Sequence, residues 1–564
     1  MSILLYEFVT HIVFYKSKMN YFIAILAILI IIFLWNNHSK KKKLRKLKKY
    51  IISSWGKPKD KEYYNFYSIS QYFQNTSHKK NAFQTISDRT ANDLDINEIF
   101  KFIDRTSSKI GQQYLYFKLR TIQNIKVLKE NEKLSIIFLE NEKLRISSQL
   151  LLSKLNNHNT YDFETLINNK TIEKPSHLKY LYLLSIGSVI SIILTTINPV
   201  FILLLMPIFI INTIFHYKNK QNINYYISAI TQLVKSLNVG EQLATETEIK
   251  NHFKDVSFLK KIKRVKLKTQ FVSFDNKMDD PITSFLWLFV ELIKIQFNLG
   301  TILFYSFIDS INNEKQNLDK LFQFIGKIDV AITIASIKSG SLNTCKPQFI
   351  KEQNIITTDI YHPLIKNCIT NSIELNNKSL LLTGSNMSGK TTFIRTLAVN
   401  TILSQTLNIC FAKDFKLPFL KVYSSIRITD DLLDDTSYYL QEVLTIKELI
   451  ETSNNKAPCL FVLDEIFKGT NTIERISGGK SILSYLNKNH FVVVSTHDIE
   501  LTDLLKDEFD LYHFTESIYN NELNFDHKLK QGKLTTRNAI KILELYNYPQ
   551  EIIINAKKIE KDNF

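Results

Sequence analysis

SLLLTGSNMSGKTTFIRTLA, residues 379–398, is the stretch that decides the fold of the C-terminal part of this chain. A short apolar run precedes the pattern Gly-x4-Gly-Lys-Thr, which extends from Gly384 to Thr391, and a helix-forming segment follows it. A strand, a glycine-rich loop and a helix in this order form a phosphate-binding loop. Glycines let backbone N–H groups approach the phosphates, and the amino end of the helix attracts the anion.

The residue types of this loop predict a site for ATP and Mg²⁺. Lys390 is expected to contact the β- and γ-phosphates, and the Thr391 hydroxyl is expected to ligate Mg²⁺. A chance glycine-rich turn is the alternative, and the flanking strand and helix argue against it. The residues expected to bind the nucleotide are Gly384, Ser385, Asn386, Met387, Ser388, Gly389, Lys390, Thr391 and Thr392.

Two later motifs supply the chemistry of hydrolysis. The apolar run 460–463 ends in Asp464 and Glu465. Asp464 is expected to hold Mg²⁺, directly or through water, and Glu465 to polarise the attacking water. His497 follows another apolar run and is placed to sense the γ-phosphate, with a purely structural histidine as the alternative. We therefore expect Lys390, Glu465 and His497 to be catalytic, and Thr391 and Asp464 to ligate the metal.

The pattern of apolar residues along the sequence changes at about residue 341. After that point short apolar runs, such as 379–383, 459–463 and 491–495, alternate with helical segments, which predicts an α/β sheet domain. Residues 51–179 and 218–340 are instead helix-rich, with few Gly and Pro and with long amphipathic runs such as 293–311.

Two apolar regions predict membrane-spanning helices. Residues 21–35 are apolar without a break, and eight of the ten residues 40–49 are Lys or Arg. This order favours an uncleaved anchor whose basic end faces the cytoplasm. Residues 180–217 contain no Asp, Glu, Lys or Arg and are interrupted near Asn198, which predicts a helical hairpin of two spans. A buried hairpin in a soluble core is the alternative.

Three spans place the bulk of the chain, including the ATPase domain, on the cytoplasmic side of a cell membrane, the inner membrane where there are two. The formal net charge of +18 is compatible with nucleic acid or anionic lipid as a partner, or with a Lys-rich composition typical of AT-rich genomes. The four cysteines form no C-x-x-C pair and no metal-ligand spacing with His, so we read them as reduced thiols.

A further serine points to a second subunit. One phosphate-binding loop leaves the γ-phosphate open on one side, and in ABC-type ATPases a serine-bearing segment of another subunit covers it. Ser437, between the glycine-rich loop and the Asp464-Glu465 pair, is the residue of this chain expected to do so, which predicts a homodimer.

Together these residues resemble the ATPase domain of the MutS family of DNA mismatch repair proteins. The family's Asn-Met within the loop corresponds to Asn386 and Met387. A weaker resemblance to the family's helical core and lever covers residues 88 to about 145 and the segment from residue 320. The other matching motifs are His362-Pro363-Leu364, Asp430-Asp431-Leu432, Ser437 with Glu442, Asp464 to Thr472, and Ser495-Thr496-His497.

The resemblance implies an α/β ABC-type P-loop ATPase domain preceded by an α-helical core and lever, to which this chain adds transmembrane helices. Residues 50–87 are too few for the family's mismatch-reading domain. Ser385 replaces the family's proline, and Cys368 stands where an aromatic side chain often stacks on adenine. The predicted parts are the anchor and basic stretch (1–50), the first core part (51–179), the hairpin (180–217), the second lever part (218–340) and the ATPase domain (341–564).

Two functions follow from this resemblance. In the first, a membrane-anchored dimer binds DNA with its helical arms, and the basic segment 260–268 contacts phosphates; a solvated helix face is the alternative for this segment. In the second, the ATP cycle moves the membrane hairpin or a protein partner without DNA, and residues 40–49 contact anionic lipid.

Overall fold

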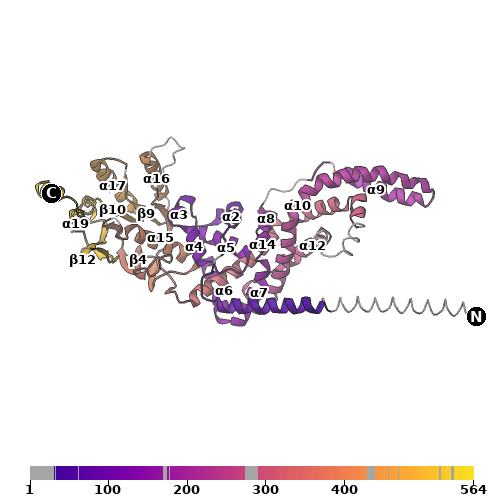
Figure 1. Cartoon of the computed structure of the whole chain (residues 1–564), viewed down its shortest axis with the longest axis horizontal. Helices are drawn as coiled ribbons and strands as arrows, with labels where there is room; N and C mark the ends of the chain where they lie inside the picture. The colour runs from indigo at the N-terminus through magenta and orange to yellow at the C-terminus, as the bar shows by residue number, and fades with distance from the viewer. Residues whose placement is uncertain are drawn as a thin grey trace, which may run out of the picture.

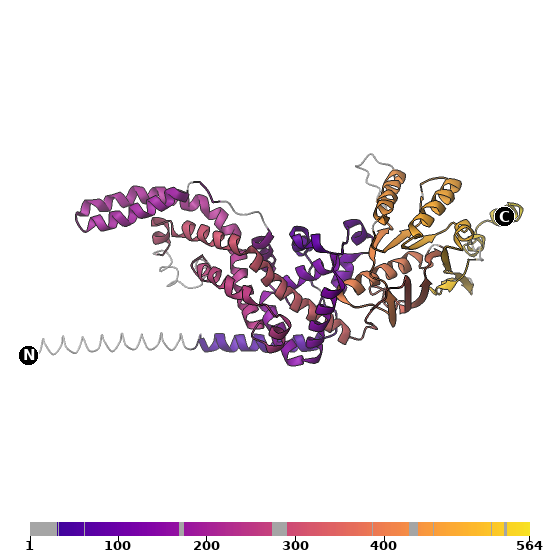
Figure 2. The same ribbon diagram turned by 180° about the vertical axis from the view of Figure 1, so that it is seen from behind.

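The computed structural model describes residues 31, 33–60, 62–168, 174–176, 178–272, 290–385, 387–427, 438–454, 456–467, 469–519, 522–534 and 539–563. The molecule is elongated (Figure 1). A domain that contains the sheets and the C-terminus forms one end, a pair of long helices forms the other, and a helical body lies between them. The same order of parts is seen from behind (Figure 2).

The helical body agrees with the helix-rich pattern of residues 51–179 and 218–340. Two short antiparallel strands interrupt it, β1 (Gln84–Thr85) and β2 (Thr121–Ile122). Its helices are one over residues 33–53, α2 (Phe66–Asn75), α3 (Asp88–Asp93), α4 (Ile96–Ile103), α5 (Lys109–Arg120), α6 (Ile125–Glu140), α7 (Glu142–Leu152), α8 (Thr165–Asn168), α11 (Thr247–His252), α12 (Ser257–Val272) and α14 (Leu299–Ser339).

The longest helix of the body, α14, packs along α5, α6 and α12. Near its middle, Phe322 stacks on Tyr72 of α2 with ring centroids 4.2 Å apart. Its carboxyl end lies next to the domain that contains the sheets (Figure 1). A displacement of α14 would therefore reach both the hairpin end of the molecule and the sheet domain.

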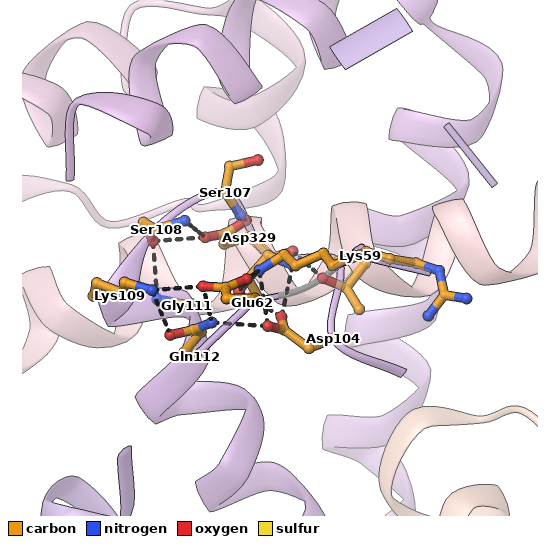
Figure 3. Close-up of polar contacts among 12 residues, drawn as sticks. Lys59, Glu62, Asp104, Ser107, Ser108, Lys109, Gly111, Gln112 and Asp329 are labelled. Atoms are coloured by element: carbon orange, nitrogen blue, oxygen red, sulfur yellow. Dashed lines mark hydrogen bonds and ion pairs between the residues drawn. The ribbon is translucent and has the colours of Figure 1, made fainter. Parts of the chain in front are cut away.

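A buried polar network joins segments that are far apart in the sequence (Figure 3). Asp329 of α14 accepts hydrogen bonds from the backbone N–H groups of Ser107 and Ser108, each at 2.8 Å, at the amino end of α5. Lys59, which follows the N-terminal helix, donates to Asp104 at 2.8 Å. Burial disfavours the charge of Lys59, but Asp104 beside it contributes to holding the pKa of the ammonium above its ordinary value. The network thus fastens the N-terminal segment to α5 and α14.

The main sheet of the C-terminal domain has six strands in the order β14-β11-β6-β10-β9-β8, all parallel except β14. Successive side chains alternate between its faces: Leu380 and Leu382 belong to the core on the α15 side, whereas Leu381 packs with α16, α17 and α18. The elements are β6 (Ser379–Thr383), α15 (Lys390–Leu407), β8 (Lys421–Ser425), α16 (Tyr438–Ser453), β9 (Cys459–Asp464), α17 (Thr472–Asn487), β10 (Phe491–Thr496), α18 (Glu500–Leu505), β11 (Phe509–His513) and β14 (Lys530–Gln531).

The three strands expected from their apolar runs, β6, β9 and β10, are confirmed. A second sheet, of four strands in the order β3-β7-β4-β5, was not predicted from the sequence. These strands are β3 (Gln348–Phe349), β4 (Asn354–Ile360), β5 (Asn371–Asn376) and β7 (Asp414–Leu417). The chain ends with a hairpin of β12 (Glu516–Tyr519) and β13 (Glu522–Phe525), then β14, α19 (Ala539–Leu545) and α20 (Gln550–Asn563).

The apolar hairpin consists of α9 (Leu178–Thr195), the short helix η4 (Pro199–Leu204) and α10 (Leu205–Leu243). Two stretches, Leu178–Thr195 and Pro199–Lys218, are long and apolar enough to cross a membrane, and only 22% and 11% of them is buried. Contrary to the expected boundary at residue 217, α10 continues into the helical body. The predicted N-terminal span lies outside the described residues, apart from 31 and 33–35, whose side chains are exposed.

A polar segment docks on the hairpin. Residues 290–296 are helical, but Asn298 has a left-handed backbone (φ 50°), so the helix expected over 293–311 is broken there and α14 begins after it. Asn298 donates to Asn212 of α10 at 2.6 Å, and Ser188 of α9 donates to the backbone carbonyl of Gln296 at 3.2 Å. These bonds attach the hairpin to the amino end of α14.

A substitution at Gly111 tests the close packing of α5 against Asp329 in the network of Figure 3. A Cβ at this position would lie 2.1 Å from Asp329 Oδ2, whereas a Cβ on Gly300 of α14 would meet nothing within 4 Å. We expect Gly111→Ala to lower the free energy of unfolding by about 2–3 kcal/mol. Gly300→Ala is the control and should change it by less than about 1 kcal/mol. Thermal unfolding of the full chain in detergent measures both, and equal midpoints would contradict the packing described here.

Candidate nucleotide site

The glycine-rich loop lies between β6 and α15, as the motif requires. Gly384 and Gly389 have φ angles of 152° and 112°, and the second is a left-handed conformation that favours glycine. Lys390 is the first residue of α15, and its ammonium donates to the carbonyl oxygens of Gly384 and Ser385 at 2.7 and 2.8 Å. Met387 is 82% exposed at the tip of the loop. Asn386 lies outside the described residues.

The two remaining loop residues are held from different sides. Ser388 donates to the carbonyl oxygen of Ser385 at 2.8 Å, which closes the turn. The Ser385 hydroxyl donates to Glu516 of β12 at 2.6 Å. Thr392 lies one residue beyond Thr391 in α15 and borders a pocket described below.

The two expected metal ligands lie together. The Thr391 hydroxyl donates to Asp464 Oδ2 at 2.8 Å, and the Ser495 hydroxyl donates to the other oxygen of the same carboxylate. Hydroxyl and carboxylate oxygens suit Mg²⁺, which takes its remaining ligands from phosphate and water. The described residues contain no cluster of three or more His, Cys, Asp or Glu side chains for a metal. The Thr391 hydroxyl and the Asp464 carboxylate are the residues that would hold a nucleotide-bound Mg²⁺.

Glu465 and His497 converge on the same edge of the sheet. His497 Nε2 lies 3.5 Å from Glu465 Oε1 and 3.3 Å from Lys390 Nζ. Glu465 has a left-handed backbone (φ 61°), and its N–H donates to the carbonyl oxygen of Ser495 at 2.8 Å. Such a conformation costs a non-glycine residue about 1–3 kcal/mol and is found mostly at functional sites. The structure thus brings all three expected catalytic residues together.

The segment expected to complete the site of a second subunit is only partly described, from Tyr438 onward. Ser437 and the neighbouring Asp430 and Asp431 lie outside the described residues, so the role of Ser437 stays a prediction. The helix after them, α16, begins at Tyr438. Glu442 of this helix is buried and accepts a hydrogen bond from the backbone N–H of Phe467, just after Glu465. Helix α16 is thereby linked to the acidic motif.

A pocket of about 220 Å³ adjoins the phosphate loop. Its lining includes Cys368, which the resemblance places at the adenine, together with Thr392, Phe514 and His527. His527 Nδ1 lies 3.0 Å from the carbonyl oxygen of Ser388. Sequence reasoning missed His527, because it belongs to no motif and comes to the loop only through the fold of β13 and β14. A larger cleft, of about 950 Å³, lies between residues 341–344 and 359–370 and is not lined by Lys390, Asp464, Glu465 or His497.

Comparison with known families supports the assignment of this domain. Residues 380–562 match the model of MutS domain V. The match starts at the second residue of β6 and contains the phosphate loop, both acidic residues and His497.

Curated relatives extend the similarity to nearly half of the chain. The DNA mismatch repair proteins MutS of Lysinibacillus sphaericus, Bacillus licheniformis and Clostridium tetani are 28%, 30% and 26% identical over 280, 258 and 271 residues. The aligned parts cover 47%, 43% and 45% of this chain, but 32%, 29% and 30% of the relatives. The chain thus spans about a third of the length of the curated relatives it matches.

His527 provides a test of the pocket. If the pocket holds the base of a nucleotide, His527→Ala should weaken nucleotide binding about tenfold, because a side chain in contact with the loop and the pocket is lost. His513→Ala is the matched control, because His513 lies on β11 and contacts the carbonyl oxygen of Gly532 instead. Titration with a fluorescent ATP analogue measures both affinities. Equal affinities in the two variants would show that the base of the nucleotide does not bind in this pocket.

Proposed function

Because this chain belongs to the MutS family through its C-terminal domain V, we propose that it binds and hydrolyses ATP with Mg²⁺. The observation that carries the proposal is the meeting of Lys390, Glu465 and His497 beside the Thr391–Asp464 pair. A positive side chain, an acid that can orient water and an oxygen pair for the cation are the groups that phosphoryl transfer to water needs.

Each of these side chains has one role in the proposed reaction. Lys390 and the amino end of α15 hold the phosphates and balance their charge. Glu465 orients the attacking water and accepts its proton. His497, between Lys390 and Glu465, contacts the γ-phosphate. Thr391 and Asp464 would hold Mg²⁺, which stabilises the negative charge that develops on the phosphate oxygens.

A homodimer is part of the proposal. The described loop of one chain leaves Met387 exposed, so the loop is open to solvent on that side. Ser437 of a second copy would cover it, as the resemblance implies. MutS relatives share the matched domain, and this supports pairing of two such domains.

We propose further that the hairpin of α9 and α10 anchors the chain in the cytoplasmic membrane, with the ATPase domain in the cytoplasm. Its apolar side chains are exposed along both helices; Leu183 and Ile193 of α9 and Ile210 of α10 are examples at 63%, 58% and 59%. A soluble core would cover such a surface, whereas lipid tails solvate it. The hairpin extends away from the ATPase domain (Figure 1) and so can insert without burying the site.

DNA is the first candidate partner of the helical body. The curated relatives are DNA mismatch repair proteins, and Lys260, Lys261 and Lys263 of α12 are exposed and able to meet phosphates. The alternative is coupling of the ATP cycle to the membrane or to a protein partner. It is favoured by α10, which runs without a break from the apolar hairpin into the helical body.

Glu465→Gln tests the hydrolysis step. This variant of the full chain in detergent should retain ATP binding and lose at least about 100-fold in turnover, because the amide cannot accept the proton from water. Glu508→Gln is the matched control: Glu508 forms an ion pair with Lys480, and its replacement should leave turnover unchanged. Hydrolysis that continues at the normal rate in Glu465→Gln would refute the role of this carboxylate.

A second experiment separates the two partners. ATPase rates of the chain in vesicles are measured with duplex, mismatched and branched DNA, and with neutral or anionic lipid. Stimulation by DNA that falls steeply with salt supports DNA binding, because phosphate contacts release counterions. A rate that ignores DNA but responds to lipid supports the alternative. Release of the chain from vesicles by an alkaline wash would refute the membrane anchor.

A further inference from the structure

Two carboxylates of the helical body face the ATPase domain. Asp93, the last residue of α3, is buried and accepts hydrogen bonds from the Ser424 hydroxyl at 2.7 Å and from the N–H groups of Ile426 and Arg427 at 3.1 and 2.9 Å. These bonds involve mainly backbone, so they fix the end of β8 against α3. Asp93 is a structural fastening between the two regions.

Asp95 is different, because its partners here are side-chain guanidinium groups, those of Arg427 and Arg395. Arg427 donates to both of its oxygens, at 2.8 and 2.7 Å, and Arg395 Nη1 approaches one of them at 3.4 Å. Asp95 precedes α4 in the N-cap position, yet its side chain makes no capping hydrogen bond, and its backbone is left-handed (φ 51°). An aspartate there would ordinarily cap the helix, with a gain of about 1 kcal/mol. The Asp95 carboxylate does not contribute this capping free energy, because it contacts the two guanidinium groups instead.

Arg395 connects Asp95 to the nucleotide site. It lies four residues after Thr391 on α15, so the two side chains share one face of the helix. No described residue accepts a hydrogen bond from its Nε, which is buried. Burial and the charge of Arg427 lower the pKa of the Arg395 guanidinium. The opposing, stabilising contributions come from the carboxylates of Asp95, Asp93 and Asp464.

The histidine next to Arg395 adds no charge to this group. His362 is buried, and burial together with the charge of Arg395 lowers its pKa to about 4. It is therefore neutral at physiological pH. Arg395 has carboxylates on two sides, Asp95 of the helical body and Asp464 of the site, and its bond to Asp95 is long enough to tighten.

We propose that Arg395 is a positioning residue of the nucleotide site, and that its ion pair with Asp95 couples occupancy of the cation position at Thr391 and Asp464 to helix α4 of the body. This rests on the proposed function for the identity of the ligand. A divalent cation at Asp464 repels Arg395 and drives it toward Asp95, where it competes with Arg427. The coupling is reciprocal. The factor by which a bound cation favours the Arg395–Asp95 ion pair is also the factor by which cation binding weakens when a movement of α4 withdraws Asp95.

The experiment uses the full chain in detergent and the Mg²⁺ concentration that gives half-maximal binding of a fluorescent ATP analogue. Arg395→Gln removes the repulsion, so the required Mg²⁺ concentration should fall about fivefold. Asp95→Asn leaves Arg395 without its counter-ion, so the concentration should rise about fivefold. The Mg²⁺ requirement of the double variant should lie close to that of Arg395→Gln, because Arg395 transmits the effect of Asp95 to the cation position.

The matched control crosses the same boundary. Arg89 of α3 pairs with Glu448 of α16 at 2.8 Å, and Arg89→Gln should leave the Mg²⁺ requirement unchanged. A merely structural role predicts lowered unfolding midpoints with no shift, or shifts of the same sign in both variants; either result overturns the coupling. ATP turnover is measured in parallel. The unsubstituted chain could show no ATP turnover while the two variants still shift the Mg²⁺ requirement in opposite directions. That result would refute hydrolysis but would still support the coupling.

Discussion

The parallel register of β6, β10 and β9 is the constraint on which the site depends. Ser495 of β10 lies opposite Leu382 of β6 and Asp464 of β9, and Thr496 lies opposite Thr383. The carboxyl ends of parallel strands meet at one edge of the sheet, so the phosphate loop, the acidic pair and His497 must emerge side by side. A slip of one residue in either pairing would turn Asp464 to the other face of the sheet.

Beyond the sheet, charge and hydrogen bonding join the parts of this elongated molecule. Asp329 holds the amino end of α5 on α14, and Lys59 ties the N-terminal segment to the same place. Asp93 fastens β8 to α3. These contacts use buried carboxylates, whose loss would leave unpaired donors in the interior, so each is expensive to break. The Asp93 contact joins the body to the ATPase domain, and the Asn298–Asn212 hydrogen bond joins the hairpin to the amino end of α14.

Prediction from sequence was most successful where a local pattern has one physical explanation. Apolar runs that end at a glycine-rich loop or at an acid identify β6 and β9, and the charge-free run identifies the hairpin. The second sheet was missed because its strands alternate buried and partly exposed side chains, so they form no continuous apolar run, and they carry no motif. The break at Asn298 was also missed, since the apolar spacing continues through it, although asparagine is one of the residues that adopt a left-handed backbone most readily.

The sequence by itself determined the chemistry of the loop, because Gly, Lys and Thr at this spacing act through their own backbone freedom and side-chain charge. It also determined where long apolar helices occur. Only the tertiary structure decided that His527 borders the loop, that Glu442 reaches the acidic motif, and that Asp95 meets Arg395 across 300 residues of chain. Such pairings depend on distance in space, and nothing in the local composition of either segment encodes it.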